Sequence, residues 1–279
     1  MASRAVGSRS LALSWTLRLL VIAYLVLLVL WPSSYVVRNT FHDGFSTLQQ
    51  TLQDPDVISA LKVSAEVAVT AVIINLIFGV GFSLLLVRYD FPGKRVLSAL
   101  IDLPLSVSPV VVGLALMLVY SPAYGWFGHP LEGAGIMIVF ALPGMILATC
   151  FVTVPLIVRE VVPVLEELGD DQEQAARSLG ANTFQTLRRI TLPGIRWALV
   201  YGVVLALARG LGEFGAVKVV STRIAGQSMT ATTLVEARTQ FEPQTAYTVS
   251  FLLAFAGVLC LVVVALLRHH AHRSLEGQK

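Results

Sequence analysis

The sequence is poor in charged residues and in cysteine, and both features limit the class of protein to which it can belong. Asp, Glu, Lys and Arg make up 13% of the 279 residues, whereas 56% are hydrophobic. Soluble domains carry about 25% charged residues, so this composition indicates a membrane protein with little room for a soluble domain. Cys150 and Cys260 both fall within apolar runs, where they are typical of small core residues and suggest neither a disulfide framework nor a metal site.

Several catalytic motifs are missing as well. The chain has no Gly-x-x-x-x-Gly-Lys-Ser/Thr phosphate loop, so it is not expected to bind a nucleotide cofactor itself. The Gly-x-Ser-x-Gly and His-Glu-x-x-His patterns of hydrolases are also missing, which argues against an intramembrane protease. His269, His270 and His272 form a terminal cluster that we interpret as part of a basic anchor in preference to a metal site.

Six apolar runs approach the length of about 20 residues that a helix needs to cross a bilayer. The predicted spans are residues 17–37, 61–87, 96–120, 135–158, 197–220 and 247–267. The alternating pattern of a membrane β-barrel is missing, so the expected fold is all-α. We expect a six-helix membrane domain over 17–267, with short segments at 1–16 and 268–279.

The distribution of Lys and Arg predicts the orientation, because positively charged loops stay in the cytoplasm. Fourteen of the twenty cations fall on one side of the predicted spans and five on the other. Both termini and the loop over 159–196 are therefore expected in the cytoplasm. The net charge of +3 reflects this topology, and binding of nucleic acid is not expected.

The first span has an alternative interpretation as a signal peptide, since Arg4, Arg9 and Arg18 precede its apolar stretch. The residues that follow, Pro32 to Tyr35, provide no Ala-x-Ala-like cleavage site. We therefore expect the segment to be retained as a membrane anchor.

The cytoplasmic loop contains signals for two short helices. Asp170 is a candidate cap with Glu173 in the capping-box position, and Gly180 is a candidate left-handed terminator. Asn182 and Gln185 repeat the start signal, and Leu192-Pro193 is expected to end the second helix. The predicted apolar faces consist of Ala175, Ala176 and Leu179 on the first helix and Phe184, Leu187 and Ile190 on the second. These signals allow two interpretations of the loop. It is either a docking surface for another protein or a helical hairpin that packs on the helix bundle of its own chain.

The spacing of small and apolar residues in this loop resembles that of a known family. The matching residues are Gln174, Ala175, Ala176, Gly180, Ile190, Leu192 and Pro193. Their spacing resembles the EAA loop of permease subunits in bacterial ABC importers, which reads Glu-Ala-Ala, three residues, Gly, nine residues, Ile-x-Leu-Pro. Gln174 departs from this pattern, which has Glu there, although Glu173 directly precedes it. The resemblance implies that these residues and Glu173 couple the chain to an ATPase subunit.

Other segments extend the resemblance over most of the chain. Residues 101–113, 151–160 and 208–216 are similar to the sulfate and molybdate branch, and residues 229–247 are most similar to sulfate/thiosulfate permeases. The implied fold is that of a type I, MetI-like permease, and the implied cargo is sulfate or thiosulfate. Molybdate or tungstate is the nearest alternative.

Two sets of polar residues within the spans are candidates for the translocation path. Arg209 and Glu213 lie four apart and can meet on one helix face, either as a structural ion pair or as part of an anion path. Ser106 and Ser108 lie between two prolines, where their hydroxyls can form a gate or satisfy backbone groups that the prolines leave free.

The resemblance also implies partners and a location. These are a second permease subunit, two ATP-binding subunits that hold ATP and Mg²⁺, and an extracytoplasmic sulfate-binding protein, in a bacterial inner membrane. A heterodimer is expected because sulfate importers usually employ two different permease chains. A secondary transporter driven by an ion gradient and a membrane scaffold are less favoured, because the spacing of the loop matches and no inverted halves are detectable.

Overall fold

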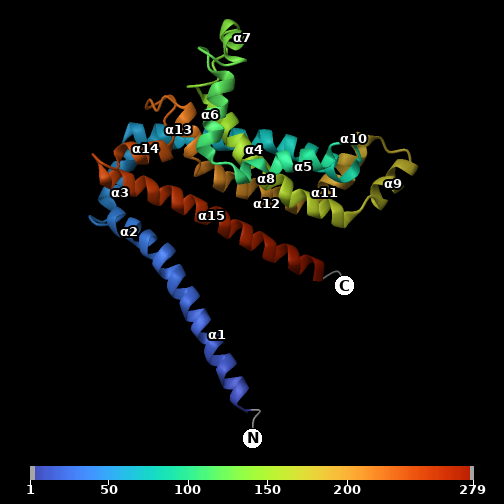
Figure 1. Cartoon of the computed structure of the whole chain (residues 1–279), viewed down its shortest axis with the longest axis horizontal. Coiled ribbons are helices and arrows are strands. Elements are labelled where there is room, and N and C mark those ends of the chain that lie inside the picture. Colours follow the sequence, from blue (N-terminus) through green and yellow to red (C-terminus); the bar gives the residue numbers. More distant parts are fainter. Residues whose placement is uncertain (1–3, 277–279) are drawn as a thin grey trace.

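The computed structural model describes the backbone of residues 4–276 and the side chains of residues 15–266, and every regular element in that part is a helix (Figure 1). The first half contains α1 (Arg4–Leu25), the π-helical turn η1 (Val26–Leu30), α2 (Trp31–Thr40), α3 (Phe45–Gln53), α4 (Pro55–Arg88), α5 (Lys94–Ser106), α6 (Pro109–Tyr120) and α7 (Gly128–Gly133). The second half contains α8 (Leu142–Leu168), α9 (Asp171–Ser178), α10 (Thr183–Thr186), the π-helical turn η2 (Leu187–Thr191), α11 (Leu192–Gly194), α12 (Arg196–Leu211), α13 (Gly215–Val220), α14 (Ala231–Arg238) and α15 (Pro243–Glu276).

Four helical segments in the described residues are long and apolar enough to cross a membrane, and six are reached if each of two bent pairs counts as one span. The four are Trp15–Thr40, α4, α8 and Pro243–Leu266 of α15. In the bent pairs, α5 meets α6 at 114°, and the segment Thr183–Gly194 meets α12 at 70°. The all-α membrane fold is confirmed, but several predicted boundaries are wrong.

The predicted span over 96–120 is not one helix. It divides at Val107 and Ser108, both of which have extended backbone with ψ of 138° and 134°. Pro109 causes this break, because the proline ring clashes with a helical conformation of the preceding residue. α6 therefore projects away from the other long helices instead of continuing α5 (Figure 1).

The predicted spans over 135–158 and 197–220 also need correction. α8 begins at Leu142, with Pro143 in its first turn, where a proline removes no helix hydrogen bond, and it continues past the predicted end to Leu168. The later span is interrupted after Leu211, and a separate short helix, α13, begins at Gly215. Hydropathy alone detects these apolar runs but does not detect where their backbone turns.

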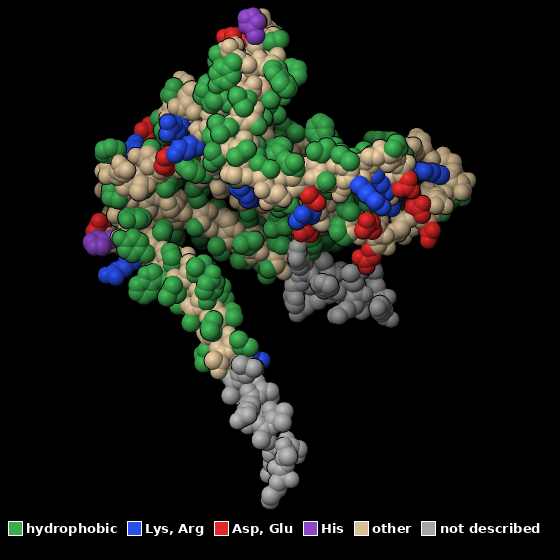
Figure 2. All heavy atoms as spheres, in the orientation of Figure 1, with side chains coloured by type: hydrophobic (Ala, Val, Ile, Leu, Met, Phe, Trp, Pro, Cys, Tyr) green, Lys and Arg blue, Asp and Glu red, His purple; other side chains and the backbone are tan. Residues whose placement is uncertain are grey.

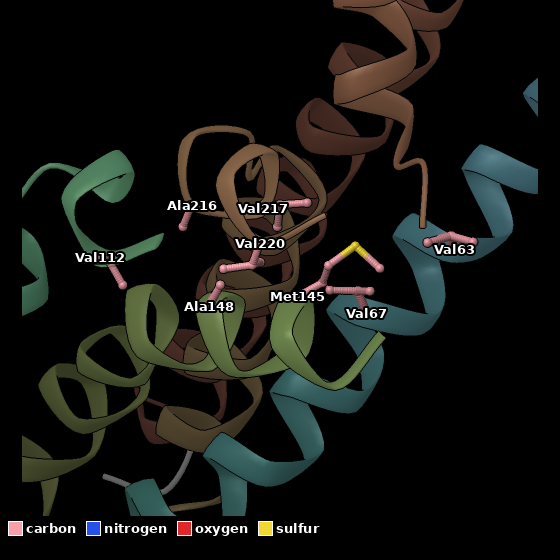
Figure 3. Close-up of a cluster of buried hydrophobic side chains, with 8 residues drawn as sticks. All are labelled: Val63, Val67, Val112, Met145, Ala148, Ala216, Val217 and Val220. Atoms are coloured by element: carbon pink, nitrogen blue, oxygen red, sulfur yellow. The ribbon is translucent and has the colours of Figure 1, made fainter. Parts of the chain in front are cut away.

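The helices pack around three apolar clusters of buried residues, the third of which joins α4, α14 and α15. One contains Val63 and Val67 of α4, Met145 and Ala148 of α8, and residues of the broken helices α6 and α13 (Figure 3). A second joins α4, α8 and α12 around Ile157, which is fully buried. The breaks before α6 and α13 thus lie next to the first cluster, since both helices contribute residues to it.

Glycines allow α4, α8 and α12 to approach closely at the second cluster. A Cβ atom at Gly202 would lie 3.0 Å from the Cα atom of Ile157, and one at Gly79 would lie 2.9 Å from the Cγ2 atom of the same residue. Small residues at helix contacts are a usual device of membrane bundles, where packing replaces the hydrophobic effect. Ile157 of α8 is held between α4 and α12 in this way.

A polar cluster fixes α14 to the start of α4, at the end of the bundle away from α9 (Figure 1). The Arg238 guanidinium donates a hydrogen bond to Asp56 at 2.8 Å, lies 3.8 Å from Asp54 and also pairs with Glu242. The hydrogen bond to Glu242 raises the pKa of Arg238. Two segments distant in sequence, the start of α4 and the end of α14, are therefore tied together at this end.

The candidate coupling loop and the two helix breaks

The first loop helix, α9, forms with a different start from the predicted one. Asp170 occupies the capping position, but its carboxylate accepts a hydrogen bond from Gln174 Nε2 at 2.7 Å and does not cap the backbone. Glu173 is buried and does not complete a capping box. The prediction of a capping box at this helix is therefore wrong.

The turn between the two loop helices and the start of the second one, α10, both form as the sequence predicts. Gly180 has a φ of +86°, and Ala181 N donates to Ala176 O at 3.0 Å to close the end of α9. Gln185 N donates to Asn182 Oδ1 at 2.8 Å, and Asn182 N donates to Gln185 Oε1 at 2.9 Å. This capping box at α10 is confirmed.

The second loop helix ends one residue after Leu192-Pro193, close to the predicted position. Helical turns continue through η2 and α11 as far as Gly194, and the chain then bends by 70° into α12. Pro193 falls in the first turn of α11, directly after the wide turn of η2, where the missing N–H removes no regular helix bond. The loop therefore joins the fifth span through a bend and not through a flexible break.

The outward face of the loop exposes small and apolar residues beside charged ones such as Arg177 and Arg189. Ala175 is exposed, Leu179 of the turn after α9 is 90% exposed, and Phe184 of α10 is 68% exposed. Ala176, Leu187 and Ile190 are half-buried, as is Leu192, while Gly180 and Pro193 are exposed. The predicted stripe on the second helix is thus divided, with Phe184 pointing outward and the rest turned toward the bundle.

The inward face carries an ion pair that the sequence did not reveal. Arg88, the last residue of α4, donates from Nε to Glu173 Oε2 at 3.1 Å and from Nη2 to Glu173 Oε1 at 3.2 Å. Thr191 of η2 donates its hydroxyl to Glu173 Oε1 at 2.8 Å. In the sequence, Arg88 is only one of the positive charges that predict the orientation. Its pairing is not visible there, because its partner is far away along the chain.

The connection that follows Arg88 carries a second, exposed ion pair. Lys94 donates to Asp90 Oδ1 at 2.9 Å, and this hydrogen bond lowers the pKa of the Asp90 carboxyl. Pairs of this kind at the surface contribute little stability. The buried pair of Arg88 and Glu173 is therefore the stronger constraint on this end of the bundle.

The two helix breaks lie against each other. A Cβ atom at Gly215 would lie 3.1 Å from Pro109 Cβ, and one at Gly113 would lie 2.7 Å from Ala216 O. α6 and α13 therefore approach each other closely, directly after the points where the third and fifth spans are interrupted. Broken helices that meet within a membrane bundle are a frequent setting for ion sites in transporters.

Arg209 and Glu213 form the predicted pair at the second break. Arg209 Nη1 lies 2.7 Å from Glu213 Oε2. The Glu213 side chain is 1% exposed, whereas that of Arg209 is 39% exposed. Glu213 Oε1 accepts from Ala216 N at 3.0 Å, and the Thr232 hydroxyl donates to Glu213 O at 2.8 Å. Glu213 therefore fixes the backbone of the break, and Arg209 is the more accessible charge.

The two serines lie on either side of the first break. Ser106 ends α5 and Ser108 precedes α6, and both side chains are exposed. Ser108 makes no capping hydrogen bond from its hydroxyl, so its side chain does not cap the start of α6. Its hydroxyl is open to the surroundings at the point where the two breaks meet.

Among the residues that the structure describes, no group of three or more His, Cys, Asp or Glu side chains is placed to hold a metal ion. The side chains of His269, His270 and His272 lie outside the described residues. The site in the described part is thus one of backbone breaks and ion pairs.

Comparison with known proteins identifies the family of this chain. Residues 75–276 match the family described as "Binding-protein-dependent transport system inner membrane component". The chain belongs to this family. The permease is 44% identical over 251 residues to the sulfate transport system permease protein CysW of Synechococcus elongatus, covering 90% of this chain and 87% of that protein.

Two further relatives place the permease in the sulfate branch, as the sequence predicts. It is 40% identical over 254 residues to the CysW protein of Escherichia coli, covering 90% of this chain and 85% of that protein. It is 34% identical over 275 residues to the sulfate transport system permease protein CysT of Salmonella typhimurium, covering 98% and 99% of the two chains.

Solved structures share the fold of the permease. The bacterial alginate ABC transporter, in complex with an alginate pentasaccharide-bound periplasmic protein, matches with a TM-score of 0.74 and 17% identity, covering 94% of both chains. An amino acid ABC transporter matches with a TM-score of 0.53 and 19% identity, covering 82% of this chain and 98% of that one. The predicted ABC permease architecture of a multi-pass membrane protein is confirmed.

Proposed function

We propose that this permease is one of two membrane subunits of an ATP-driven importer of sulfate or thiosulfate in a bacterial inner membrane. The observation that carries the proposal is the similarity to sulfate transport permeases over most of the chain. CysW and CysT are two separately named permeases, and the chain resembles both, which supports a heterodimer. A binding protein outside the cytoplasm delivers the anion, as the description of the family suggests.

The outward face of the loop is the proposed contact with the ATPase subunits. Ala175, Leu179 and Phe184 offer a small apolar surface at one end of the molecule (Figure 1). Two ATP-binding subunits hold ATP and Mg²⁺ in this proposal, and their closure moves the cytoplasmic loop. Such an apolar patch on an exposed loop fits a protein partner better than solvent.

The adjoining helix breaks are the proposed translocation path. Arg209 supplies positive potential for a dianion, and Ser106 and Ser108 supply hydroxyl groups at the other break. A charged group inside a membrane bundle is costly and marks a functional site by default. Movement of the helices around these breaks changes which side of the membrane the path opens to, and the chain thereby alternates access.

A crosslinking experiment tests the docking surface. Cysteine is introduced at Leu179 in a Cys150→Ala, Cys260→Ala background, labelled with benzophenone maleimide and irradiated with co-expressed ATPase subunits. We expect a crosslinked product of permease and ATPase. Phe45→Cys is the matched control, since Phe45 is 76% exposed on α3 at the other end of the molecule. Equal crosslinking at both positions, or none at Leu179, contradicts the proposal.

Uptake by the complete complex tests the cargo. Proteoliposomes that contain both permeases and the ATPase, with binding protein outside, are expected to accumulate labelled sulfate only with ATP inside. Excess thiosulfate is expected to compete more strongly than molybdate. Uptake of molybdate in preference to sulfate would assign the alternative cargo.

A further inference from the structure

Arg88 joins three separate segments at the end of α4. Its Nη1 atom donates to Leu165 O at 3.2 Å and its Nη2 atom to Gly169 O at 2.7 Å, at the end of α8. The same guanidinium group contacts both carboxylate oxygens of Glu173 in α9. The side chains of Arg88 and Glu173 are 14% and 9% exposed, so the group is largely shielded from water.

Thr191 adds a fourth segment to this cluster. Its buried hydroxyl donates to Glu173 Oε1, and it ends the π-helical turn η2. Wide turns of this kind are often found at functional positions in helices. One carboxylate therefore connects the two loop helices to each other and, through Arg88, to the ends of α4 and α8.

Bonds of this kind resist displacement more than exposed ion pairs do. Charge-assisted hydrogen bonds are stronger than neutral ones, and a guanidinium that contacts both carboxylate oxygens also fixes their relative orientation. All four bonds of Arg88 go to the adjoining ends of neighbouring elements. α9 therefore cannot shift relative to α4 without breaking several of these bonds together.

α4 and α8 lead from this cluster to the helix breaks. Ile157 of α8 packs against α4 at Gly79, and Val63, Val67 and Met145 lie in the apolar cluster that also contains α6 and α13 (Figure 3). Packed helices transmit a displacement because their cores are dense and hardly compressible. A continuous mechanical connection thus runs from the loop to the proposed path.

We propose that Arg88, Glu173 and Thr191 form a clasp, a set of positioning residues that makes the loop over 171–194 move as one body with α4 and α8. This inference rests on the proposed function, since the motion it transmits is driven by ATP hydrolysis on the partner subunits. Glu173 acts inside the permease and not at the ATPase surface, because its carboxylate is turned inward. The clasp converts docking into transport, and its loss leaves docking intact.

Variants of the clasp test the inference in proteoliposomes that contain the complete complex. Arg88→Met, Glu173→Gln and Thr191→Val are compared by the ratio of sulfate transported to ATP hydrolysed. We expect Arg88→Met to lower this ratio about tenfold, because several charge-assisted bonds are lost, and Thr191→Val to lower it less. Arg95→Met is the matched control, since Arg95 is exposed in the first turn of α5 and lies outside the clasp.

Glu173→Gln and one additional variant, a charge exchange, guard against a loss of folding. Glu173→Gln keeps the shape of the side chain and an oxygen for Thr191, and the exchange of Arg88→Glu with Glu173→Arg restores opposite charges. Either single change is expected to lower the ratio of sulfate transported to ATP hydrolysed. We expect the double variant with swapped charges to recover part of this loss. Crosslinking to the ATPase through Leu179→Cys is expected to persist in every clasp variant. A transport ratio in Arg88→Met and Glu173→Gln equal to that of wild type overturns the inference.

Hydrogen exchange separates failure of the clasp from failure of the proposed function. If the wild-type complex shows no ATP-dependent sulfate uptake, the proposed function fails. Amide hydrogen exchange alone then tests whether the clasp holds the loop. We expect amides of residues 171–194 to exchange at least about tenfold faster in Arg88→Met than in wild type, with Arg95→Met unchanged. Equal exchange in all three proteins overturns the clasp.

Discussion

Glu213 fixes the break between α12 and α13, because its buried carboxylate accepts a hydrogen bond from Ala216 N while its other oxygen faces Arg209. The two residues of the pair therefore have different roles. Glu213 is a structural acceptor, and Arg209 presents a partly accessible charge beside the proposed path. The sequence predicts the pair from its spacing but does not reveal which member is exposed.

Replacement of Arg209 by Leu is expected to abolish sulfate uptake while the complex still assembles. The change also leaves Glu213 without its charge partner. Loss of a buried partner costs about 3–5 kcal/mol, and the exposure of Arg209 reduces this expectation to about 1–2 kcal/mol. Uptake and size-exclusion profiles of the purified complex provide the measurement. Arg209→Lys, which keeps the charge, is the control, and normal uptake by Arg209→Leu contradicts the path role.

Asn182 determines where the second loop helix begins. Asn182→Ala removes the capping box and is expected to destabilise this helix by about 1 kcal/mol, since a backbone donor loses its acceptor. Faster hydrogen exchange over residues 183–186 would report the change. Asn182→Asp keeps a capping oxygen and is expected to retain most of the protection, so equal exchange in the two variants contradicts this role.

Local signals at single residues are reliable where the partner lies within a few positions. Gly180 and the pair of Asn182 and Gln185 behave as the sequence predicts, because their contacts close within one turn. Asp170 and Glu173 have the same spacing but do not form a capping box, since Glu173 is drawn inward by Arg88. A contact across 85 positions leaves no local trace in the sequence.

At the scale of elements, α4, α8 and α12 are held together by close contacts around Ile157. Gly202→Ala places a methyl group 3.0 Å from the Cα atom of Ile157, and backbone cannot move aside. We expect the change to destabilise the permease by about 1–3 kcal/mol, measured by thermal unfolding in detergent. Gly81→Ala is the matched control, since no atom lies within 4 Å of its Cβ position. A lower melting temperature for Gly81→Ala than for Gly202→Ala contradicts this packing.

The elements themselves are only partly predictable from hydropathy. The apolar runs correctly locate the membrane helices, because every span must be apolar over about 20 residues. The runs do not show that the third and fifth spans are broken, since the residues at the breaks are as apolar as their neighbours or too few to alter the average. Pro109 indicates the first break, and the glycines around Glu213 indicate the second, but neither fixes the angle between the pieces.

At the scale of the whole molecule, two projecting apolar segments leave large hydrophobic surfaces exposed. The segment Trp15–Thr40 has no buried residues in its most apolar window and leans away from the bundle, and the arm of α6 and α7 projects from the opposite side (Figure 1). Hydrophobic side chains cover much of both (Figure 2). Lipid and a second permease subunit are the expected neighbours of these surfaces, whereas the loop at the far end is left for the ATPase.

The central claim is that ATP hydrolysis on another chain drives sulfate through this permease. The most direct measurement is uptake of labelled sulfate by proteoliposomes with ATP inside and binding protein outside, with and without the ATPase subunits. The account predicts accumulation only with the ATPase and hydrolysable ATP, and loss of accumulation with Arg209→Leu. Uptake that persists without the ATPase subunits contradicts the account.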